Sequence, residues 1–358
     1  MITLYATEPG SIVHLEGSRF QVFFLEKLCC EMAAVKVKQI ILFDWCDITG
    51  PAIKFAIARS IPVGFIADGG RYVARLHETG KCLHLSHQKQ CFGDAEFQLA
   101  IVESLLRAKL HNSRVLLMQL NRRRNYKSVG KAADSLAYLL EALPAATTRK
   151  GFWQFEAASA RIYFQAFSYL LPEAFNFKGR SANSAAGDRI NSLLNLGYAL
   201  LSQNLYTCVQ KFGLNPDFGN LHHTCQNHTP LVCDLMEQFR APIVEALVAD
   251  LVNQNCIKIG DFLPPDERGG LYLHPQALRE FLLHWETKLQ SFATHLYAGQ
   301  VSYRQCLELQ VKEYLACVKG EQDVYRSMLC QDNSAVETAS CQTKSKQRGT
   351  EKSNLQVE

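Results

Sequence analysis

The first eighty residues alternate between apolar and polar positions in short runs, which is the period of β-strands. Two of these runs, 11–24 and 61–76, are each interrupted by a glycine-bearing turn and therefore predict β-hairpins. Between them, residues 37–43 form an apolar strand, and Thr49, followed by Gly50 and an early proline, opens a short helix. We expect a small sheet with one helix in this part of the chain.

From Asp94 onward the apolar positions recur every three or four residues, which is the period of an α-helix. Asp94 can cap a long first helix in which Phe97, Ile101 and Leu105 lie on one face. Proline or glycine breaks separate further helices that are predicted at 132–143, 152–171, 188–212, 230–253, 275–298 and 303–329. The pattern predicts an α+β fold with a β-rich N-terminal domain followed by a larger, all-helical catalytic domain.

A polar segment without a clear period, rich in His, Gln and Lys, separates these two patterns. We place the β domain at 1–85, a linker at 86–93 and the helical domain at 94–328. Residues 329–358 contain almost no large apolar side chains, so they cannot bury a core and are predicted to form a disordered tail.

Composition narrows the class of protein only slightly. The 358 residues carry a formal net charge of +4, so a surface that binds a polyanion has to come from local clustering. The 13 cysteines are scattered, odd in number and without a CxxC pair, which predicts reduced thiols. The chain begins without a basic and apolar leader and has no apolar run near the roughly 20 residues of a membrane helix, so we expect a cytoplasmic protein with no membrane partner.

Three short motifs contain candidate chemistry, and the first is Glu156-Ala-Ala-Ser-Ala-Arg161-Ile-Tyr163. On a helix, Glu156 and Tyr163 are seven residues apart and share one face, so a carboxylate and a phenol point the same way. Taken alone, the pair is more typical of a solvated surface charge beside a core aromatic.

The second motif is a turn-rich loop, 213–222, which follows an apolar helix and ends on His222. Loops on a rigid scaffold often carry ligands, although His222 by itself is also typical of a surface histidine. In the third motif, Asp234 and Glu237 lie three residues apart on one helix face, where two like charges need a metal or a basic partner. Arg240 could be that partner, and Pro242 predicts a kink or break just beyond it.

Basic side chains also gather in one place, where a cationic track could contact a DNA backbone. The candidates in this cluster are Arg122, Arg123, Arg124 and Lys127. The other interpretation is a solvated helix end, because cations favour the C-terminal dipole. Further candidate DNA contacts are Arg161, Arg180 and Arg240, which are near the three motifs in sequence.

Taken together and in this order, the three motifs resemble the CRISPR-associated spacer-acquisition nuclease, the integrase subunit of the adaptation complex. In that family a Glu in E-x-x-x-A-R-x-Y, a His closing G-L-(D/N)-P-x-x-G-x-L-H and an acid in D-L-M-E-x-F-R-P bind one divalent metal. The resemblance, which covers roughly residues 1–325, assigns these roles to Glu156, His222 and Glu237. It makes Asp234 and Tyr163 auxiliary residues. The chain departs from the family pattern at three positions, Ala157, Arg189 and an inserted Ala241.

The resemblance implies a metal-dependent DNA endonuclease and integrase. Such an enzyme inserts captured foreign DNA fragments into a CRISPR array by transesterification with a 3′-hydroxyl, which is spacer acquisition in prokaryotic antiviral defence. One imidazole and two carboxylates suit Mn²⁺ or Mg²⁺. The resemblance also implies double-stranded DNA as the substrate, a homodimer formed through the β domain, and a small ferredoxin-like partner protein.

Two other functions remain open at this point. One is a stand-alone metal-dependent nuclease or transposon-type integrase that acts on branched DNA. The other is a non-enzymatic DNA-binding scaffold, in which the acids form an ion-pair network and a zinc ion is held by His222, His223, Cys225, His228 and Cys233. The spacing of these five residues is poor for zinc, because there is no second well-spaced pair of ligands.

Overall fold

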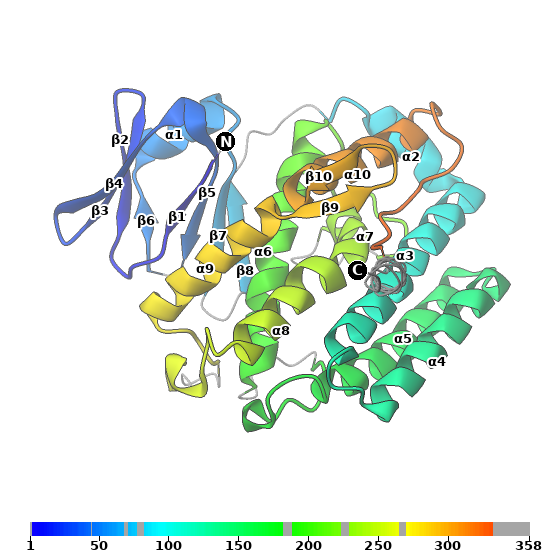
Figure 1. Ribbon diagram of the computed structural model, residues 1–358. Helices are drawn as coiled ribbons and strands as arrows, with labels where there is room; N and C mark the ends of the chain where they lie inside the picture. Colours follow the sequence, from blue (N-terminus) through cyan, green and yellow to red (C-terminus); the bar gives the residue numbers. More distant parts are fainter. Residues whose placement is uncertain are drawn as a thin grey trace, which may run out of the picture.

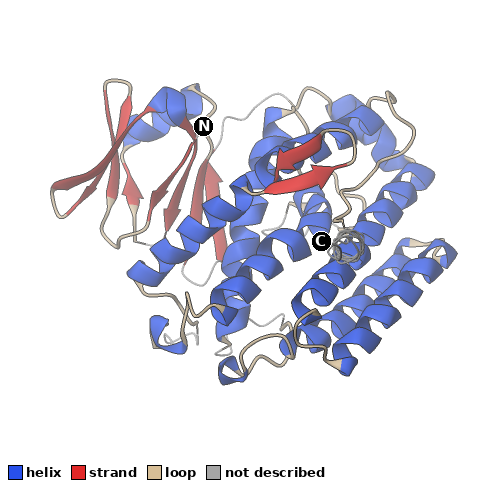
Figure 2. Cartoon of the chain, viewed as in Figure 1, coloured by secondary structure: helices blue, strands red, loops and turns tan. Residues whose placement is uncertain are grey.

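The computed structural model describes residues 2–43, 45–67, 71–76, 82–181, 188–222, 229–264 and 270–331. Most strands gather at one end of the molecule, and helices together with one short β-ribbon form the rest (Figure 1 and Figure 2). The predicted α+β class is confirmed. No helix among the described residues is long and apolar enough to cross a bilayer.

The N-terminal part contains two four-stranded sheets. The first has the order β4 (Lys27–Ala33), β3 (Arg19–Phe24), β2 (Ile12–Glu16) and β6 (Asp47–Ile48). The second has the order β1 (Ile2–Ala6), β5 (Val37–Phe43), β7 (Val63–Ala67) and β8 (Arg71–Leu76). Both predicted hairpins are confirmed, because β2 pairs antiparallel with β3, and β7 pairs antiparallel with β8. Strand β5 coincides with the predicted strand 37–43, and it pairs in parallel with β1 and β7.

Strand β5 separates two hydrophobic cores. Successive side chains of a strand point to opposite faces. Ile40 and Leu42 therefore belong to a small core beneath helix α1 (Gly50–Ala58), whereas Ile41 and Phe43 belong to the large helical core. The sheet is thus buried on both faces, which explains why β5 is apolar at nearly every position.

The described chain has nine helices beyond the β-rich part, and all of them except α2 contribute residues to the large core. The nine helices are α2 (Leu85–Gly93), α3 (Ala95–Asn121), α4 (Lys127–Ala142), α5 (Arg149–Ser168), α6 (Arg189–Lys211), α7 (Pro230–Phe239), α8 (Ala246–Asn253), α9 (Pro275–Gln290) and α10 (Tyr303–Val318). The predicted cap is present, because the side chain of Asp94 accepts hydrogen bonds from the backbone of Glu96 and Phe97. Figure 1 shows α6 next to the sheet, with α3, α4 and α5 packed together farther away.

The segment 86–93, which the sequence analysis places as a linker, belongs to helix α2. Its polar composition hides the helical period, but one glutamine, Gln88, is 2% exposed. Gln88 Nε2 donates to the carbonyl of Asn215 at 3.0 Å, and its Oε1 accepts from the Asn215 amide at 2.7 Å. Helix α2 therefore holds the start of the loop that leads to His222.

Two predicted helices end earlier than the sequence pattern suggests. The helix predicted over 275–298 ends at Gln290, and an antiparallel ribbon of β9 (Phe292–His295) and β10 (Gly299–Ser302) follows it. The helix predicted over 303–329 ends at Val318. Apolar residues continue beyond both ends, and tertiary packing rather than helical period decides where they go.

The chain after α10 is bound to α3, so the predicted disordered tail begins too early. Asn112 of α3 donates to the carbonyl of Met328 at 3.0 Å and accepts from the amide of Cys330 at 2.8 Å. Residues 329–331 are thus described and attached, whereas 332–358 lie outside the described residues.

A π-helical segment, Arg240–Glu245, joins α7 to α8 without a break. A π turn holds more residues than an α turn, and π segments within α-helices are frequent at functional sites. The kink or break predicted at Pro242 is thus a π-helical segment. The insertion of Ala241 falls in the same segment, so the wider turn accommodates both the extra residue and the proline.

Candidate active site

Two of the predicted ligands, Glu156 and Glu237, meet at one lysine. Glu156 lies in α5 and Glu237 in α7, and Lys109 of α3 contacts both. The Lys109 Nζ is 2.7 Å from Glu156 Oε1 and 2.7 Å from Glu237 Oε2. Packing of α3 against α5 and α7 thus brings together carboxylates that are far apart in the sequence.

Glu237 is buried and remains ionised. Burial alone would raise its pKa, but the charges of Arg240 and Lys109 outweigh this effect and lower the pKa to about 2. Arg240 Nε lies 3.1 Å from Glu237 Oε1, so the ion pair that the sequence offered as an alternative to a metal is present. Burial alone would likewise lower the pKa of Lys109, but Glu237 and Glu156 raise it. The two positive charges of Lys109 and Arg240 thus balance the two negative charges of Glu156 and Glu237.

Asp234 has different partners from Glu237, although both lie on α7. Asp234 is fully buried, and its Oδ1 lies 2.7 Å from His222 Nδ1. Its two oxygens also accept hydrogen bonds from the backbone amides of Asn220, Leu221 and His222. Asp234 therefore fixes both the loop and the imidazole ring.

This arrangement orients His222. With Nδ1 turned toward Asp234, the other ring nitrogen, Nε2, is the one left to act as a ligand. Burial alone would lower the pKa of His222, but the hydrogen bond with Asp234 and the charge of Glu237 raise it overall. Carboxylate-backed histidines are typical of metal sites.

Glu245 is a buried carboxylate that the sequence analysis did not identify. The Tyr198 hydroxyl donates to Glu245 Oε1 at 2.7 Å. Burial and the neighbouring Glu245 raise the pKa of both Tyr198 and Tyr163. Both phenols therefore stay protonated, and Tyr163 can donate a hydrogen bond but cannot act as a base near neutral pH.

Apart from the fully buried Asp234, these side chains surround one cavity of about 200 Å³. Its charged and phenolic lining residues are Lys109, Glu156, Tyr163, Arg180, Tyr198, His222, Glu237, Arg240 and Glu245. The guanidinium groups of Arg180 and Arg240 lie 5.3 Å and 4.7 Å from the centre of the Tyr198 ring. The cavity thus offers carboxylates and an imidazole for a cation, and arginines for an anion.

The other predicted DNA contacts lie outside this cavity. Arg122, Arg123, Arg124 and Lys127 are exposed where α3 ends and α4 begins, roughly 20 Å along α3 from Lys109. Arg161 is also exposed, on α5. Their contact with DNA stays a prediction.

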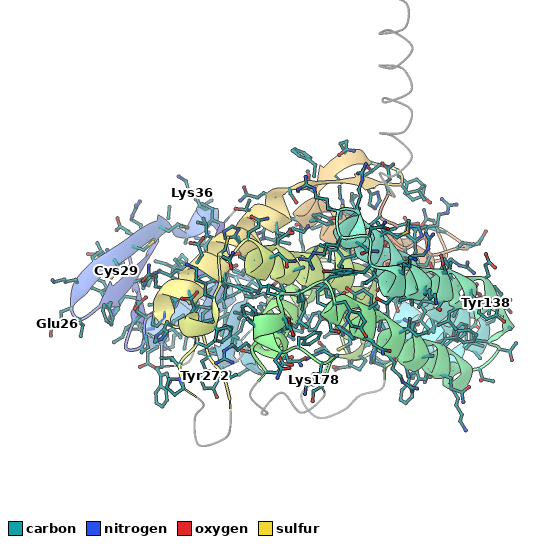
Figure 3. The ribbon with its side chains drawn as sticks, turned by 60° about the horizontal axis from the view of Figure 1, so that its bottom comes forward. Glu26, Cys29, Lys36, Tyr138, Lys178 and Tyr272 are labelled. Atoms are coloured by element: carbon teal, nitrogen blue, oxygen red, sulfur yellow. The ribbon has the colours of Figure 1, made fainter. Side chains whose placement is uncertain are left out.

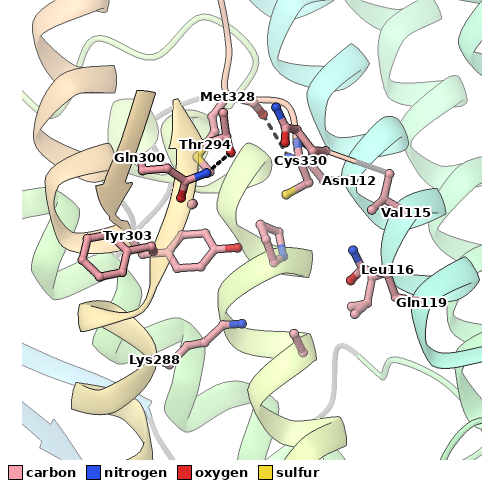
Figure 4. A pocket seen from close by; sticks show the side chains of 15 residues that line it. Asn112, Val115, Leu116, Gln119, Lys288, Thr294, Gln300, Tyr303, Met328 and Cys330 are labelled. Carbon is pink, nitrogen blue, oxygen red and sulfur yellow. Dashed lines mark hydrogen bonds between the residues drawn. The ribbon is translucent and has the colours of Figure 1, made fainter. Parts of the chain in front are cut away.

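A second cavity, of about 250 Å³, borders a different part of α3 (Figure 4). Lys288 and Tyr303 point into it, and none of its lining residues is an aspartate, glutamate or histidine. Although it is slightly larger, this cavity offers no ligand set for a divalent cation.

Lys109, Tyr198 and Glu245 are the site residues that the motifs did not reveal. A weak signal existed for Lys109 and Glu245, because each interrupts a run of apolar positions in a helix. Of the five residues considered for zinc, His223, Cys225 and His228 lie outside the described residues. Burial raises the pKa of the Cys233 thiol to about 11, which disfavours the thiolate that zinc requires.

The donor set fits a divalent metal, although the ligands are not yet gathered around one point. Two carboxylates and a free imidazole nitrogen are a suitable set for Mn²⁺ or Mg²⁺. Among the described residues, however, no three His, Cys, Asp or Glu side chains stand close enough together to hold a metal as they are. The Lys109 ammonium lies between Glu156 and Glu237.

The fold and the cavity define a class of protein. Carboxylates, an imidazole and arginines from separate helices and loops surround one site that is suited to phosphodiester chemistry. The sequence profile described as CRISPR associated protein Cas1 matches residues 4–287. Because this match spans most of the chain, the protein belongs to the CRISPR-associated Cas1 family. The predicted resemblance is confirmed.

Curated relatives cover most of the chain. The CRISPR-associated endonuclease Cas1 3 of Thermus thermophilus is 28% identical over 326 residues, which is 89% of this chain and 94% of that protein. A CRISPR-associated exonuclease Cas4/endonuclease Cas1 fusion of Rhodospirillum rubrum is 27% identical over 333 residues, which is 89% of this chain and 56% of the fusion. The chain therefore spans little more than half the length of that fusion.

Solved structures share the fold. A casposase bound to integration product gives a TM-score of 0.79 at 22% identity, covering 93% of this chain and 94% of that one. A Cas1 protein from Thermotoga maritima gives 0.77 at 19% identity, covering 91% and 100%. A chain of a Cas6-RT-Cas1–Cas2 complex gives 0.82 at 23% identity, covering 92% of this chain and 36% of that one.

Proposed function

We propose that this chain is a metal-dependent DNA endonuclease and integrase, which inserts captured DNA fragments into a CRISPR array by 3′-hydroxyl transesterification. The observation that carries the proposal is the convergence of Glu156, His222 and Glu237, from three separate motifs, on one cavity that two arginines also line. Membership of the Cas1 family supports the same function, since curated members are named endonucleases.

Glu156, Glu237 and the Nε2 of His222 would hold the Mn²⁺ or Mg²⁺ ion. A bound divalent cation supplies Lewis-acid stabilisation of the charge that develops on the phosphate in such a reaction. Asp234 keeps the His222 ring in the orientation that presents Nε2. Arg180 and Arg240 line the same cavity and can bind the non-bridging phosphate oxygens. Tyr163 can donate a hydrogen bond there, because its hydroxyl stays protonated, whereas the Tyr198 hydroxyl already donates to Glu245.

The nucleophile determines the reaction. Water would hydrolyse the phosphodiester, whereas the 3′-hydroxyl of a captured fragment would exchange one phosphodiester for another and join two strands without an outside energy source. Exchange conserves the number of phosphodiester bonds, so it needs no activated cofactor. We propose joining as the physiological reaction and cutting as a side activity of the same site.

A strand-transfer assay tests this function. A labelled short duplex with free 3′-hydroxyl ends is incubated with supercoiled plasmid, with Mn²⁺, or with EDTA, or with the Glu156→Ala variant. We expect joining that requires the metal and is lost in Glu156→Ala. A matched control is Glu103→Ala, because Glu103 forms an exposed surface pair with Arg107 and should not affect joining.

If the wild-type protein binds DNA but neither cuts nor joins it under any of these conditions, the catalytic proposal is wrong and the scaffold takes its place. The same reactions are repeated with the ferredoxin-like partner protein added, because we propose that this partner bridges two homodimers of the chain. One solved structure with this fold is a Cas6-RT-Cas1–Cas2 complex, which supports a partner of this kind.

Exposed apolar side chains support the proposed homodimer. The β-rich part exposes Leu25, Leu28, Val35 and Trp45, each by more than half of its surface. Figure 3 shows Glu26 and Cys29, which neighbour Leu25 and Leu28 in the sequence, toward one end of the molecule and Tyr138 toward the other. Large apolar side chains that a β-rich part exposes often contribute to a protein interface. We further propose that the exposed cations at Arg122–Arg124 and Lys127 extend the DNA path beyond the cavity, and that the protein acts in the prokaryotic cytoplasm.

A further inference from the structure

The Lys109 ammonium occupies the place between the two carboxylates that a divalent cation would need. Its Nζ contacts Glu156 Oε1 and Glu237 Oε2, each at 2.7 Å, and the lysine side chain is 14% exposed. A divalent ion binds carboxylate oxygens at about 2.0–2.2 Å, so it needs the same space next to these atoms. An ammonium and a metal ion cannot both remain there, because their charges repel one another at short range.

The two carboxylates depend on Lys109 to different degrees. Glu237 has a second cation, because Arg240 Nε lies 3.1 Å from its other oxygen. For Glu156, Lys109 is the ion-pair partner among the described residues. Departure of Lys109 would leave Glu156 without a positive neighbour unless another cation replaced it. A metal ion is such a cation.

A displaced Lys109 also needs a new anion, since its side chain is mostly buried. The lysine lines the same cavity as Arg180 and Arg240, where a phosphodiester would bind. Lysine has a flexible four-carbon stem and a compact charge, so its ammonium can move between a carboxylate and a phosphate without a change of backbone. The same cavity would therefore receive both the cation that competes with Lys109 and the phosphate that can accept it.

We propose that Lys109 is an exchangeable internal cation, which neutralises Glu156 and Glu237 when no metal is bound and turns to a DNA phosphate when the metal replaces it. This inference rests on the proposed metal site and adds a coupling to it. DNA that attracts Lys109 frees the carboxylates and strengthens metal binding, and by thermodynamic reciprocity the metal strengthens DNA binding to the same degree. The enzyme would thus acquire its metal most readily when its substrate is present.

The test measures Mn²⁺ affinity by isothermal titration calorimetry, with and without a short duplex that has 3′-dideoxy ends and cannot be joined. In the wild-type protein we expect the duplex to strengthen Mn²⁺ binding about ten-fold, which is within the usual range of such couplings. In Lys109→Met, Mn²⁺ should bind about ten-fold more tightly than in the wild type without DNA, and the duplex should change this affinity less than about two-fold.

A matched control is Lys38→Met, which removes a comparably buried lysine from an ion pair elsewhere. Lys38 Nζ lies 2.8 Å from Glu308 Oε1, and its side chain is 13% exposed. Its loss should leave Mn²⁺ affinity unchanged. If Lys109→Met does not fold, as judged by its thermal melting without metal, two measurements remain. These are the wild type with and without duplex, and Lys109→Arg, which keeps the charge and should not tighten Mn²⁺ binding.

The outcomes separate this inference from the function on which it rests. If the wild type and Lys109→Met bind Mn²⁺ equally well without DNA, or if the duplex leaves wild-type affinity unchanged, the exchange does not occur, although the metal site stands. If no protein binds Mn²⁺ with or without duplex, the proposed metal site itself is overturned. Tighter binding in Lys109→Met together with loss of the coupling supports the proposal.

Discussion

Two buried polar clusters lie on different faces of helix α6 and are built in opposite ways. Where α6 meets strand β5, Gln39 is fully buried, and its Nε2 donates to Thr3 Oγ1 at 3.1 Å and to Asn204 Oδ1 at 3.3 Å. Its Oε1 accepts from Thr207 Oγ1 at 3.0 Å. In the cavity on the other face, the cluster consists of charged groups, and Glu237 is shared between two cations.

The difference between uncharged and charged groups determines what each cluster can do. In the neutral cluster the amide donors and the oxygen of Gln39 are all satisfied by uncharged partners, so the cluster fixes the sheet against the helices and has no reason to change. The charged cluster has rival partners for the same atoms and a cavity of about 200 Å³ beside it. Rival partners allow exchange, which a site that binds a cation and an anion requires. Substitutions in the two clusters should therefore affect different properties.

The largest effect should come from removing a proposed ligand in the charged cluster. We expect Glu237→Gln and His222→Ala to reduce strand joining by about 1,000-fold or more, because loss of the metal removes several kcal/mol of charge stabilisation. DNA affinity, measured by fluorescence anisotropy with the same duplex, should change only about three-fold. Loss of DNA binding to the same degree as joining would mean that these residues are structural.

An intermediate effect should come from Asp234, which supports a ligand without being one. Asp234→Asn removes the charge that orients His222, and replacement of such supporting groups typically costs about 10–100-fold in metal affinity or activity. We expect a rise of this size in the Mn²⁺ concentration that gives half-maximal joining. Asp217→Asn is the control, because Asp217 is exposed in the same loop. An equal rise in that variant would place the effect in the loop rather than in the His222 contact.

The smallest effect on joining should come from the neutral cluster. Gln39→Leu leaves Thr3, Asn204 and Thr207 without their buried partner and should lower the free energy of unfolding by about 1–3 kcal/mol. Joining per folded molecule should remain at the wild-type rate. Denaturant unfolding measures the first quantity, and Gln290→Leu at an exposed position is the control. A Gln39→Leu variant that folds but joins DNA poorly would contradict the prediction that the neutral cluster affects only stability.

Several elements could be predicted from local pattern alone. Strand β5 has the predicted bounds, because its apolar run is short and flanked by turn signals, and Asp94 caps α3 as expected. Helix α2 was missed for the opposite reason. Its residues are polar almost throughout, and the buried Gln88 that attaches it to the 213–222 loop has no signature in a sequence.

The candidate site likewise contains some residues that the sequence pointed to and others that it did not. Motif spacing and family resemblance pointed to Glu156, His222 and Glu237, and all three line one cavity. Lys109 and Glu245 line it too, but each lies within an apolar helical run without a motif of its own. A lysine in such a run is compatible with many roles, so its partners could not be named in advance.

By itself, the sequence determined the α+β class, both N-terminal hairpins and the residue types available for chemistry, because hydrophobic period and turn composition act over a few residues. Only the tertiary structure decided which charges face one another. Ion pairs such as Lys109 with Glu156 and Glu237 depend on how α3 packs against α5 and α7. That packing is a sum of many weak contacts between distant segments, and no local pattern encodes it.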